Sequence, residues 1–170
     1  MGKVADEESE VDIWREFLIA ILLHNEAVAD RLGLQVVDVA ALVLLEMRGP
    51  LPVGAIAEEL ALPSATTTRV IDRLERAGYV RRVRGERDRR TVIVELREGG
   101  LDDYEAAAEP SRRHLFELGA HYTEEQVPLL LDIFVRLAGA YRSATGELRA
   151  TPTRPRRRAR ADDQPSPADP

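Results

Sequence analysis

The chain of 170 residues contains no cysteine. Disulfides, thiolate metal sites and cysteine-based peroxide sensing are therefore excluded. There is also no run of 18 apolar residues and no signal-like leader, so we expect no membrane span and a cytoplasmic location. Hydrophobic residues make up 44% of the chain, which is enough for one domain of ordinary size plus a tail.

Patterns that support catalysis or metal binding are missing as well. The only histidines are His24, His114 and His121, and no carboxylates cluster beside them at ligand spacing. We find no Ser-His-Asp order, no glycine-rich phosphate loop and no paired carboxylates. The sequence therefore predicts no catalytic residue, no metal and no cofactor, and a protein that is not an enzyme.

What is present is a succession of patterns between Gly49 and Leu96 that is typical of domains that bind duplex DNA. Residues 53–60 carry apolar side chains at i, i+3, i+4 and i+7, which predicts a short amphipathic helix. A turn at 61–63 leads to a second helix, which Gly78 ends. One face of this helix is apolar and the opposite face is polar. The apolar face carries Val70, Ile71, Leu74 and Ala77, and the polar face carries Thr66, Arg69, Arg73 and Arg76. Two short helices joined by a tight turn form a helix-turn-helix, whose second helix enters the major groove.

The first half of that second helix, residues 64–69, reads Ser-Ala-Thr-Thr-Thr-Arg. Threonine is a poor helix former, so stability alone does not favour this composition. Short hydroxyl groups bind phosphates or bases, threonine methyls contact thymine, and arginine can bind guanine through two nitrogens. In the simpler interpretation, Ser64 caps the helix and the threonines fill exposed positions.

Two β-rich runs, residues 80–84 and 91–96, flank a charged loop at 85–90 and predict a β-hairpin. The loop carries three arginines, which suits insertion into a minor groove, where the negative potential is concentrated. Asp88 is then a local partner that orients one arginine. The alternative is a solvated turn without a partner.

Several of these residues together resemble the winged-helix core of MarR-type (multiple antibiotic resistance) regulators. The resemblance rests on Asp-Arg-Leu-Glu-x-x-Gly-Tyr-Val-x-Arg at 72–82, on Asp-Arg-Arg at 88–90 and on Val-x-Leu-x-x-x-Gly at 94–100. It extends over residues 11–148. It implies a homodimeric repressor or activator whose recognition helix lies in the major groove and whose wing arginine reaches the minor groove.

The chain departs from the family pattern at the starts of two helices. Residues 63–65 read Pro-Ser-Ala where such proteins often have Ser-Pro-Ser, so the hydroxyl cap either moves to Ser64 or is lost. Residues 96–100 read Leu-Arg-Glu-Gly-Gly in place of Leu-Thr-x-x-Gly, which replaces an N-cap hydroxyl with arginine.

The net charge of −6 argues against a nucleic-acid partner until its distribution is considered. Residues 69–90 hold nine arginines and four acidic residues, which gives +5. Residues 1–30 hold eight acidic residues and two basic ones, which gives −6. This separation of charge along the chain favours a DNA-binding segment.

The predicted fold is mostly α-helical with a small β-hairpin wing, and the winged helix-turn-helix core is flanked by dimerisation helices. We expect a bend near Pro110 and a last helix that opens with a capping box at 123–126. The predicted segments are a flexible N-terminus at 1–10, a dimerisation helix at 11–35, the DNA-binding domain at 36–97, C-terminal dimerisation helices at 98–148 and a disordered tail at 149–170.

The terminal helices carry more apolar surface than a winged helix of about 60 residues can cover, so we expect a homodimer with a two-fold axis. Its two recognition helices would lie about 34 Å apart on a pseudo-palindromic operator. The predicted DNA-binding residues are Ser64, Ala65, Thr66, Thr68, Arg69, Arg73, Arg81, Arg82, Arg87, Asp88, Arg89 and Arg90.

The resemblance also implies an effector cavity between the dimerisation helices and the DNA-binding lobe, which often takes small aromatic acids or phenols. The candidate lining residues are Trp14, Phe17, His24 and Arg48, although Trp14 and Phe17 also suit a plain core. Two other functions stay open, namely a winged helix that binds protein instead of DNA, and a small-molecule-binding protein on the same scaffold. The arginine-rich wing disfavours both.

Overall fold

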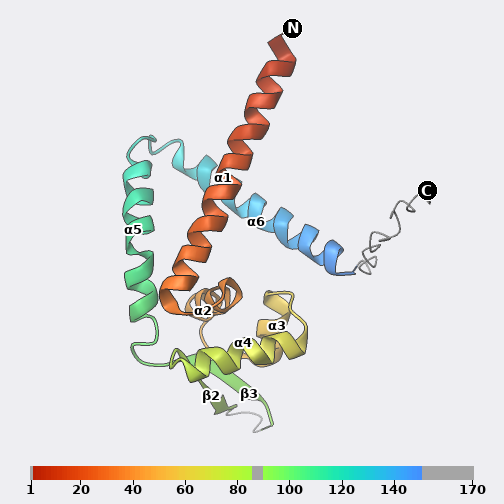
Figure 1. The fold of residues 1–170 in the computed structure, drawn as a ribbon, viewed down its shortest axis with the longest axis vertical. Coiled ribbons are helices and arrows are strands. Elements are labelled where there is room, and N and C mark those ends of the chain that lie inside the picture. The colour runs from red at the N-terminus through yellow and green to blue at the C-terminus, as the bar shows by residue number, and fades with distance from the viewer. Residues whose placement is uncertain (1, 86–89, 151–170) are drawn as a thin grey trace, which may run out of the picture. The chain divides into compact units, whose positions relative to one another are not determined.

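The computed structural model describes residues 2–85 and 90–150, with side chains from Glu10 onward. These residues form six helices and three strands (Figure 1). The chain divides between Val127 and Pro128 into two units, which are described separately below. Of the tail predicted at 149–170, only the first two residues are described, and they belong to the last helix.

The first helix, α1 (Gly2–Leu32), packs along α5 (Asp102–Gly119) and α2 (Val36–Arg48) in the first unit (Figure 1). Its start at Gly2 differs from the flexible segment predicted at 1–10. Val28 and Ala29, near its C-terminal end, are its buried residues among those whose side chains are described. Among the helices that the structure describes, none combines the length and the hydropathy that a membrane span requires.

The helix-turn-helix and the wing follow in the predicted order. The elements are α3 (Val53–Glu59), α4 (Ser64–Arg76), β2 (Val80–Arg84) and β3 (Val92–Leu96). The sequence did not predict β1 (Leu51–Pro52), which pairs antiparallel with β3 and gives the sheet the order β1-β3-β2. A two-residue strand is too short to show an alternating pattern. We call residues 80–96, the hairpin of β2 and β3, the wing.

A single apolar core joins α2, α3, α4 and the sheet. The predicted apolar face of α4 is confirmed for Val70, Ile71 and Leu74, which are fully buried. It is wrong for Ala77, the C-cap residue, which is exposed because the helix ends there. Gly78 ends the helix at a φ of 87°, which glycine adopts without steric cost. The buried residues of this core are Ala41, Leu42, Leu44, Leu45, Ile56, Val70, Ile71, Leu74, Tyr79, Val80 and Val94.

One buried ion pair fixes α4 on α2. Arg73 Nη2 lies 2.6 Å from Asp38 Oδ1, and Arg73 Nε lies 2.9 Å from Asp38 Oδ2. Asp38 is fully buried, and its Oδ2 also accepts the backbone N–H of Gln35 at 3.0 Å. The same carboxylate therefore stabilises the start of α2 and holds the middle of α4.

A close backbone contact fastens the end of α4 to the start of α5. The N–H of Arg97 donates to Tyr79 O at 3.0 Å, so the residue after β3 is bonded to the residue that precedes β2. A side chain at Gly100 would place its Cβ 2.4 Å from the same Tyr79 oxygen. Gly100 is therefore required by space and not by its φ angle.

The last helix, α6, spans Val127–Ala150. In the segment before it, one of the two hydrogen bonds of the predicted capping box is present. Thr123 N–H donates to Gln126 Oε1 at 2.9 Å, and α6 begins at Val127. Pro110 lies inside α5, which spans it without ending. The second unit consists of α6 from Pro128 onward, and Leu129, Leu131, Phe134 and Val135 are exposed on it.

We predict that removing Arg73 costs more stability than removing Asp38. Arg73→Ala leaves a fully buried carboxylate without its cation and should lower the free energy of unfolding by about 3–5 kcal/mol. Asp38→Ala should cost about 1–3 kcal/mol, because the Arg73 side chain is 30% exposed and can turn toward water. Urea unfolding of both variants measures this order.

Arg69→Ala is the matched control, because Arg69 lies on the same helix, is exposed and has no ion pair within residues 2–85 and 90–150. It should change stability by less than about 0.5 kcal/mol. If Arg73→Ala cost no more than the Arg69 control, the ion pair would not hold α4.

Candidate nucleic-acid interface

The N-terminal end of α4 has free backbone donors and no side-chain cap. The N-cap residue is Pro63, whose carbonyl accepts the N–H groups of Thr66 and Thr67 at 2.9 and 3.0 Å. Of the two outcomes left open for the cap, the hydroxyl cap is lost. The N–H groups of Ser64 and Ala65 therefore point out of the helix end, where the helix dipole favours an anion.

The three threonines that follow have different surroundings. Thr67 is fully buried and its hydroxyl donates to Pro63 O at 3.2 Å, which gives it a structural role. Thr68 is exposed, and its hydroxyl donates to Ser64 O at 3.0 Å, so its lone pairs and methyl group stay accessible. Thr66 is half-buried and Arg69 is exposed. Thr66, Thr68 and Arg69 are therefore the side chains that this half of α4 can offer to a base edge.

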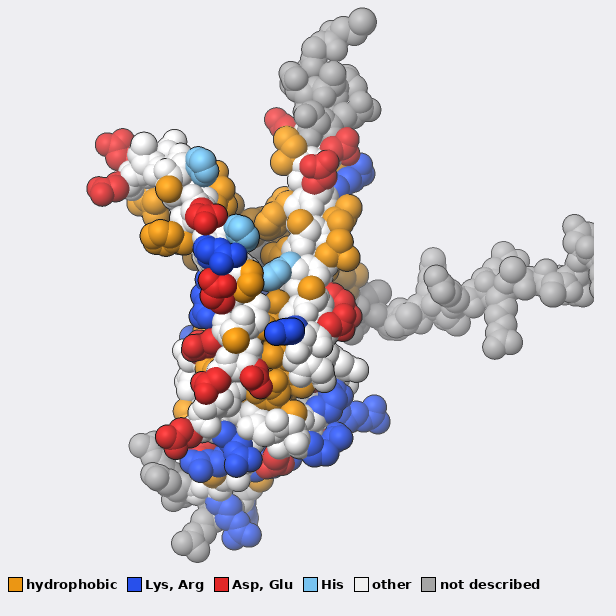
Figure 2. Space-filling model, turned by 60° about the vertical axis from the view of Figure 1, so that its left-hand side comes forward, with side chains coloured by type: hydrophobic (Ala, Val, Ile, Leu, Met, Phe, Trp, Pro, Cys, Tyr) orange, Lys and Arg blue, Asp and Glu red, His pale blue; other side chains and the backbone are white. Residues whose placement is uncertain are grey.

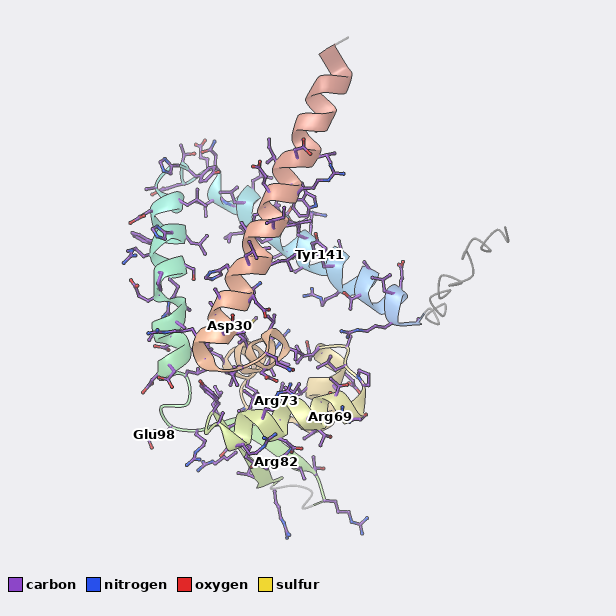
Figure 3. The ribbon with its side chains drawn as sticks, in the orientation of Figure 1. Asp30, Arg69, Arg73, Arg82, Glu98 and Tyr141 are labelled. Atoms are coloured by element: carbon purple, nitrogen blue, oxygen red, sulfur yellow. The ribbon has the colours of Figure 1, made fainter. Side chains whose placement is uncertain are left out.

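Arg73 does not share the exposed position predicted for it. Its guanidinium points to α2, where the bidentate pair with Asp38 holds it (Figure 3). The hydrogen bonds that Arg73 donates to Asp38 raise the pKa of Arg73 above its usual value, against a smaller effect of burial. Helical spacing places Arg73 on the same face of α4 as Arg69 and Arg76. It does not show that Asp38, which lies 35 residues earlier on α2, faces Arg73 in the fold.

Arg82 also has internal partners where the sequence predicts a phosphate contact. Its Nη2 lies 2.6 Å from Asp72 Oδ1, and its Nη1 pairs with Glu75 Oε2. Its backbone N–H donates to Glu75 Oε1 at 3.2 Å. Burial lowers the pKa of Arg82, but the hydrogen bonds with the two carboxylates outweigh this effect and raise it above its usual value.

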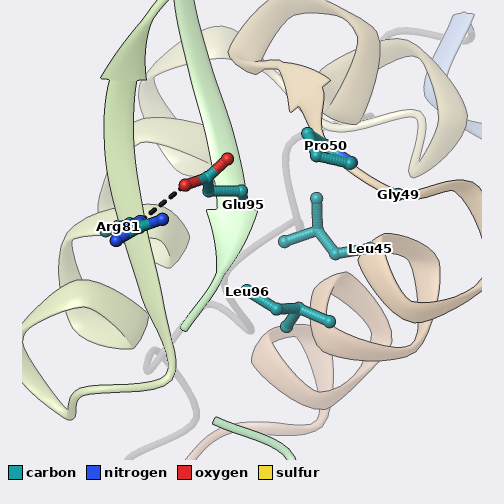
Figure 4. A pocket seen from close by; sticks show the side chains of 6 residues that line it. All are labelled: Leu45, Gly49, Pro50, Arg81, Glu95 and Leu96. Carbon is teal, nitrogen blue, oxygen red and sulfur yellow. Dashed lines mark hydrogen bonds and ion pairs between the residues drawn. The ribbon is translucent and has the colours of Figure 1, made fainter. Parts of the chain in front are cut away.

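Arg81 projects from the other face of β2, because side chains alternate along a strand. Its Nε lies 2.5 Å from Oε1 of Glu95, the residue opposite it on β3. The pair lines an open cavity of about 270 Å³ at the base of the wing (Figure 4). The remaining lining residues are Leu45, Gly49, Pro50 and Leu96. The Arg81 side chain is 64% exposed, so it keeps donors free for a phosphate.

Three of the predicted residues at the wing tip, Arg87, Asp88 and Arg89, lie outside the described residues. Arg90 is described and exposed. Two exposed arginines were counted in the charge of this segment but not proposed as contacts. Arg84 ends β2, and Arg76 ends α4 with its Nε bonded to Asp72 O at 3.1 Å. The signal for Arg76 was its spacing of seven residues, two helical turns, from Arg69.

The basic side chains gather at the end of the first unit that carries α4 and the wing, as Figure 2 shows, whereas acidic side chains are spread along α1 and α5. Arg69, Arg76 and Arg84 have no acidic partner within the described residues. The candidate interface is thus the exposed N-terminal half of α4 together with these arginines and Arg81.

The four residues predicted to line an effector cavity lie on two helices, and their role stays a prediction. Trp14 and Phe17 are exposed on α1, with ring centroids 5.6 Å apart. His24 is exposed further along α1, and Arg48 is exposed at the end of α2. None of them is a lining residue of the cavity at the base of the wing or of a second cavity, which Arg31 and Tyr79 help to line. Among the described residues, no three His, Asp or Glu side chains are placed to hold a metal ion.

Comparison with known proteins assigns this arrangement to a family. The model of the MarR family matches residues 34–92, the segment from the start of α2 to the start of β3. The transcriptional regulator YcgE of Bacillus subtilis is 28% identical over 132 residues, which cover 78% of this chain and 86% of YcgE. The HTH-type regulator YkoM of the same organism is 32% identical over 107 residues, which cover 59% of this chain and 70% of YkoM.

Solved structures agree with this assignment. A MarR family protein from Bacillus stearothermophilus is 25% identical, has a TM-score of 0.63, and the match covers 83% of this chain and 98% of that protein. The structure of NadR in complex with 4-hydroxyphenylacetate shares the fold at 22% identity and a TM-score of 0.60, with 74% of this chain and 89% of NadR covered. The predicted fold class and the prediction of a transcriptional regulator, not an enzyme, are confirmed. With this core, these relatives and this fold, the chain belongs to the MarR family of winged helix-turn-helix transcriptional regulators.

Proposed function

We propose that the chain represses transcription by binding a pseudo-palindromic DNA operator as a homodimer, and that a small effector releases it. In each subunit α4 lies in the major groove and the wing reaches the adjacent minor groove. The observation that carries this proposal is the first half of α4, where Thr66, Thr68 and Arg69 are accessible on one helix end and Arg69 has no acidic partner among the described residues.

Contacts with phosphates and contacts with base edges use different groups of the protein. The N–H groups of Ser64 and Ala65 suit a phosphate at the end of α4 and fix the register of the helix on the duplex. Arg69 suits guanine, and the threonine methyl groups suit thymine. Arg76, Arg81 and Arg84 suit further phosphates, because their guanidinium groups are wholly or partly open to solvent.

Uncovered apolar side chains support the homodimer. Leu22 and Leu23 on α1 are 67% and 66% exposed, and Phe116 on α5 is 85% exposed. Apolar surface of this extent on a soluble protein marks an interface. A second copy of the same chain is the occupant we propose, because one two-fold axis would cover these helices and also place two copies of α4 on one face of a duplex.

A cavity of about 320 Å³ in the first unit supports an effector site. It is lined by Arg31 and Leu32 at the end of α1, by Tyr79 just after α4, and by Asp103, Ala106 and Ala107 on α5. Burial and then the charge of Asp103 raise the pKa of Tyr79 above its usual value, so its hydroxyl is neutral and can donate at physiological pH. Arg31 can bind a carboxylate, and we propose a small aromatic or phenolic acid.

Base reading predicts a difference between two duplexes. Thr66→Ala, Thr68→Ala and Arg69→Ala should each weaken binding to a duplex selected by the pure protein by about 1–3 kcal/mol, with little effect on a scrambled duplex. Arg84→Ala should weaken binding to both and reduce the salt slope by about one unit. Parallel titrations at several salt concentrations measure both effects. If the α4 variants lost the same affinity for both duplexes, α4 would position the protein on DNA without reading its sequence. If the pure protein selected no duplex, a protein partner would be favoured.

Charged substitutions on the terminal helices test the homodimer. Leu22→Glu combined with Phe116→Glu should convert the dimer to a monomer, because two charges per subunit would be buried at the interface. Light scattering over a range of concentrations measures the mass, and Glu26→Gln, an exposed polar change on α1, is the control that should stay dimeric. A wild-type protein that is monomeric at micromolar concentration would contradict the two-fold operator.

The effector proposal is tested with a panel of phenolic and benzoic acids. An acid that binds should raise the free energy of unfolding by about 2.7 kcal/mol when its concentration is 100 times its Kd, and the melting temperature should rise accordingly. The same acid should release the protein from the duplex. Arg31→Ala should abolish this shift, and Arg48→Ala, outside the cavity, should preserve it. The reverse result would show that the effector binds near Arg48.

A further inference from the structure

Two acidic residues lie on the helix that is proposed to enter the major groove. Asp72 and Glu75 are one helical turn apart on α4, and both are partly exposed. A carboxylate near DNA phosphates weakens binding, so their presence on this helix needs a physical reason. That reason is Arg82, whose guanidinium donates to both carboxylates.

The contact joins α4 to the edge of the sheet. In the order β1-β3-β2, the strand β2 is an edge strand, so its outward backbone groups have no strand partner. Glu75 supplies a side-chain partner for this edge, because its Oε1 accepts the backbone N–H of Arg82. Its Oε2 accepts a hydrogen bond from the Arg82 side chain. Asp72 binds the second terminal nitrogen. We call this set of three residues, Asp72, Glu75 and Arg82, the wing joint.

The wing is held at its base and across its two strands, and the wing joint adds a link from the wing to α4. Its base is tied to the core through buried Val80 and Val94, and β3 is paired with β1. Arg81 and Glu95 pair across the two strands on the opposite face and stiffen the hairpin. Because Asp72 and Glu75 lie on α4 and Arg82 lies on β2, the wing joint links the helix directly to the hairpin.

We infer that Asp72 and Glu75 are positioning residues that hold the wing at a fixed angle to α4, so that major-groove and minor-groove contacts form together. This inference rests on the proposed function. It assigns Arg82 to the joint and not to a phosphate, because its charge is already balanced by two carboxylates. The two acidic residues then increase affinity for DNA although they are negatively charged.

Neutralising the acids distinguishes this role from simple electrostatics. Asp72→Asn combined with Glu75→Gln removes two negative charges and keeps the side-chain shapes. Electrostatics alone predicts tighter binding and a steeper salt slope. The wing joint predicts binding about 10-fold weaker to a duplex selected by the wild-type protein, with the melting temperature within about 5 °C of the wild type. Glu98→Gln, an exposed acid with no partner within the described residues, is the matched control and should bind no more weakly than the wild type.

Substitutions of Arg82 provide the second arm. Arg82→Lys keeps the charge but cannot bridge two carboxylates through a planar fork. If Arg82 acts in the joint, Arg82→Lys should bind as weakly as Arg82→Gln, and both should keep the wild-type salt slope. In the protein without DNA, the Arg82 N–H should exchange faster in Glu75→Gln than in the Glu98→Gln control.

Three results would overturn the inference. The first is unchanged or tighter DNA binding by the Asp72→Asn, Glu75→Gln variant. The second is near-normal DNA binding by Arg82→Lys together with a salt slope that is lower by about one unit in Arg82→Gln. The third is an Arg82 N–H that exchanges at the same rate in Glu75→Gln as in the Glu98→Gln control. A wild-type protein that selects no duplex would overturn the proposed function itself. Selection by the wild type together with any of the three results would overturn the wing joint alone.

Discussion

The position of α4 depends on a carboxylate that has no access to water. Burial of a carboxylate is costly unless it is paired, and Asp38 is bound by two nitrogens of Arg73 and by the Gln35 N–H. Hydrophobic contacts of Val70, Ile71 and Leu74 select the buried face of α4, but they are not directional and set its rotation only coarsely. The ion pair is directional, and it therefore fixes more closely which residues of α4 face outward.

The six arginines of residues 69–84 divide into two groups according to the acids near them. Arg73, Arg81 and Arg82 each bind a carboxylate and stabilise the arrangement of α4 and the wing. Arg69, Arg76 and Arg84 have no carboxylate partner among the described residues and are the ones proposed to meet DNA. A high arginine content in a DNA-binding segment thus does not measure the number of phosphate contacts. The acids of the same segment, such as Glu75, decide which arginines remain available.

Sequence patterns predicted the elements whose signal is local. The 3.6-residue period identified the buried face of α4, Gly78 identified its end, and alternation identified β3. The patterns failed where the cause is distant or short. β1 has two residues and depends on pairing with β3, and the roles of Arg73 and Arg82 depend on partners that lie on other elements. Periodicity showed the side of α4 on which Arg73 lies but not that α2 covers it.

The same contrast applies to the cavity near Tyr79, which no motif announces. It arises because α1 ends, α5 begins and α4 ends at one place in the first unit. Tyr79 lines the cavity, and its carbonyl accepts the N–H of Arg97 and lies against Gly100. Since a Cβ at position 100 would lie 2.4 Å from that carbonyl, the start of α5 and the end of α4 cannot shift independently without breaking this contact. A molecule that fills the cavity therefore contacts a residue whose backbone is continuous with the DNA-facing helix and bonded to the segment that leads into α5.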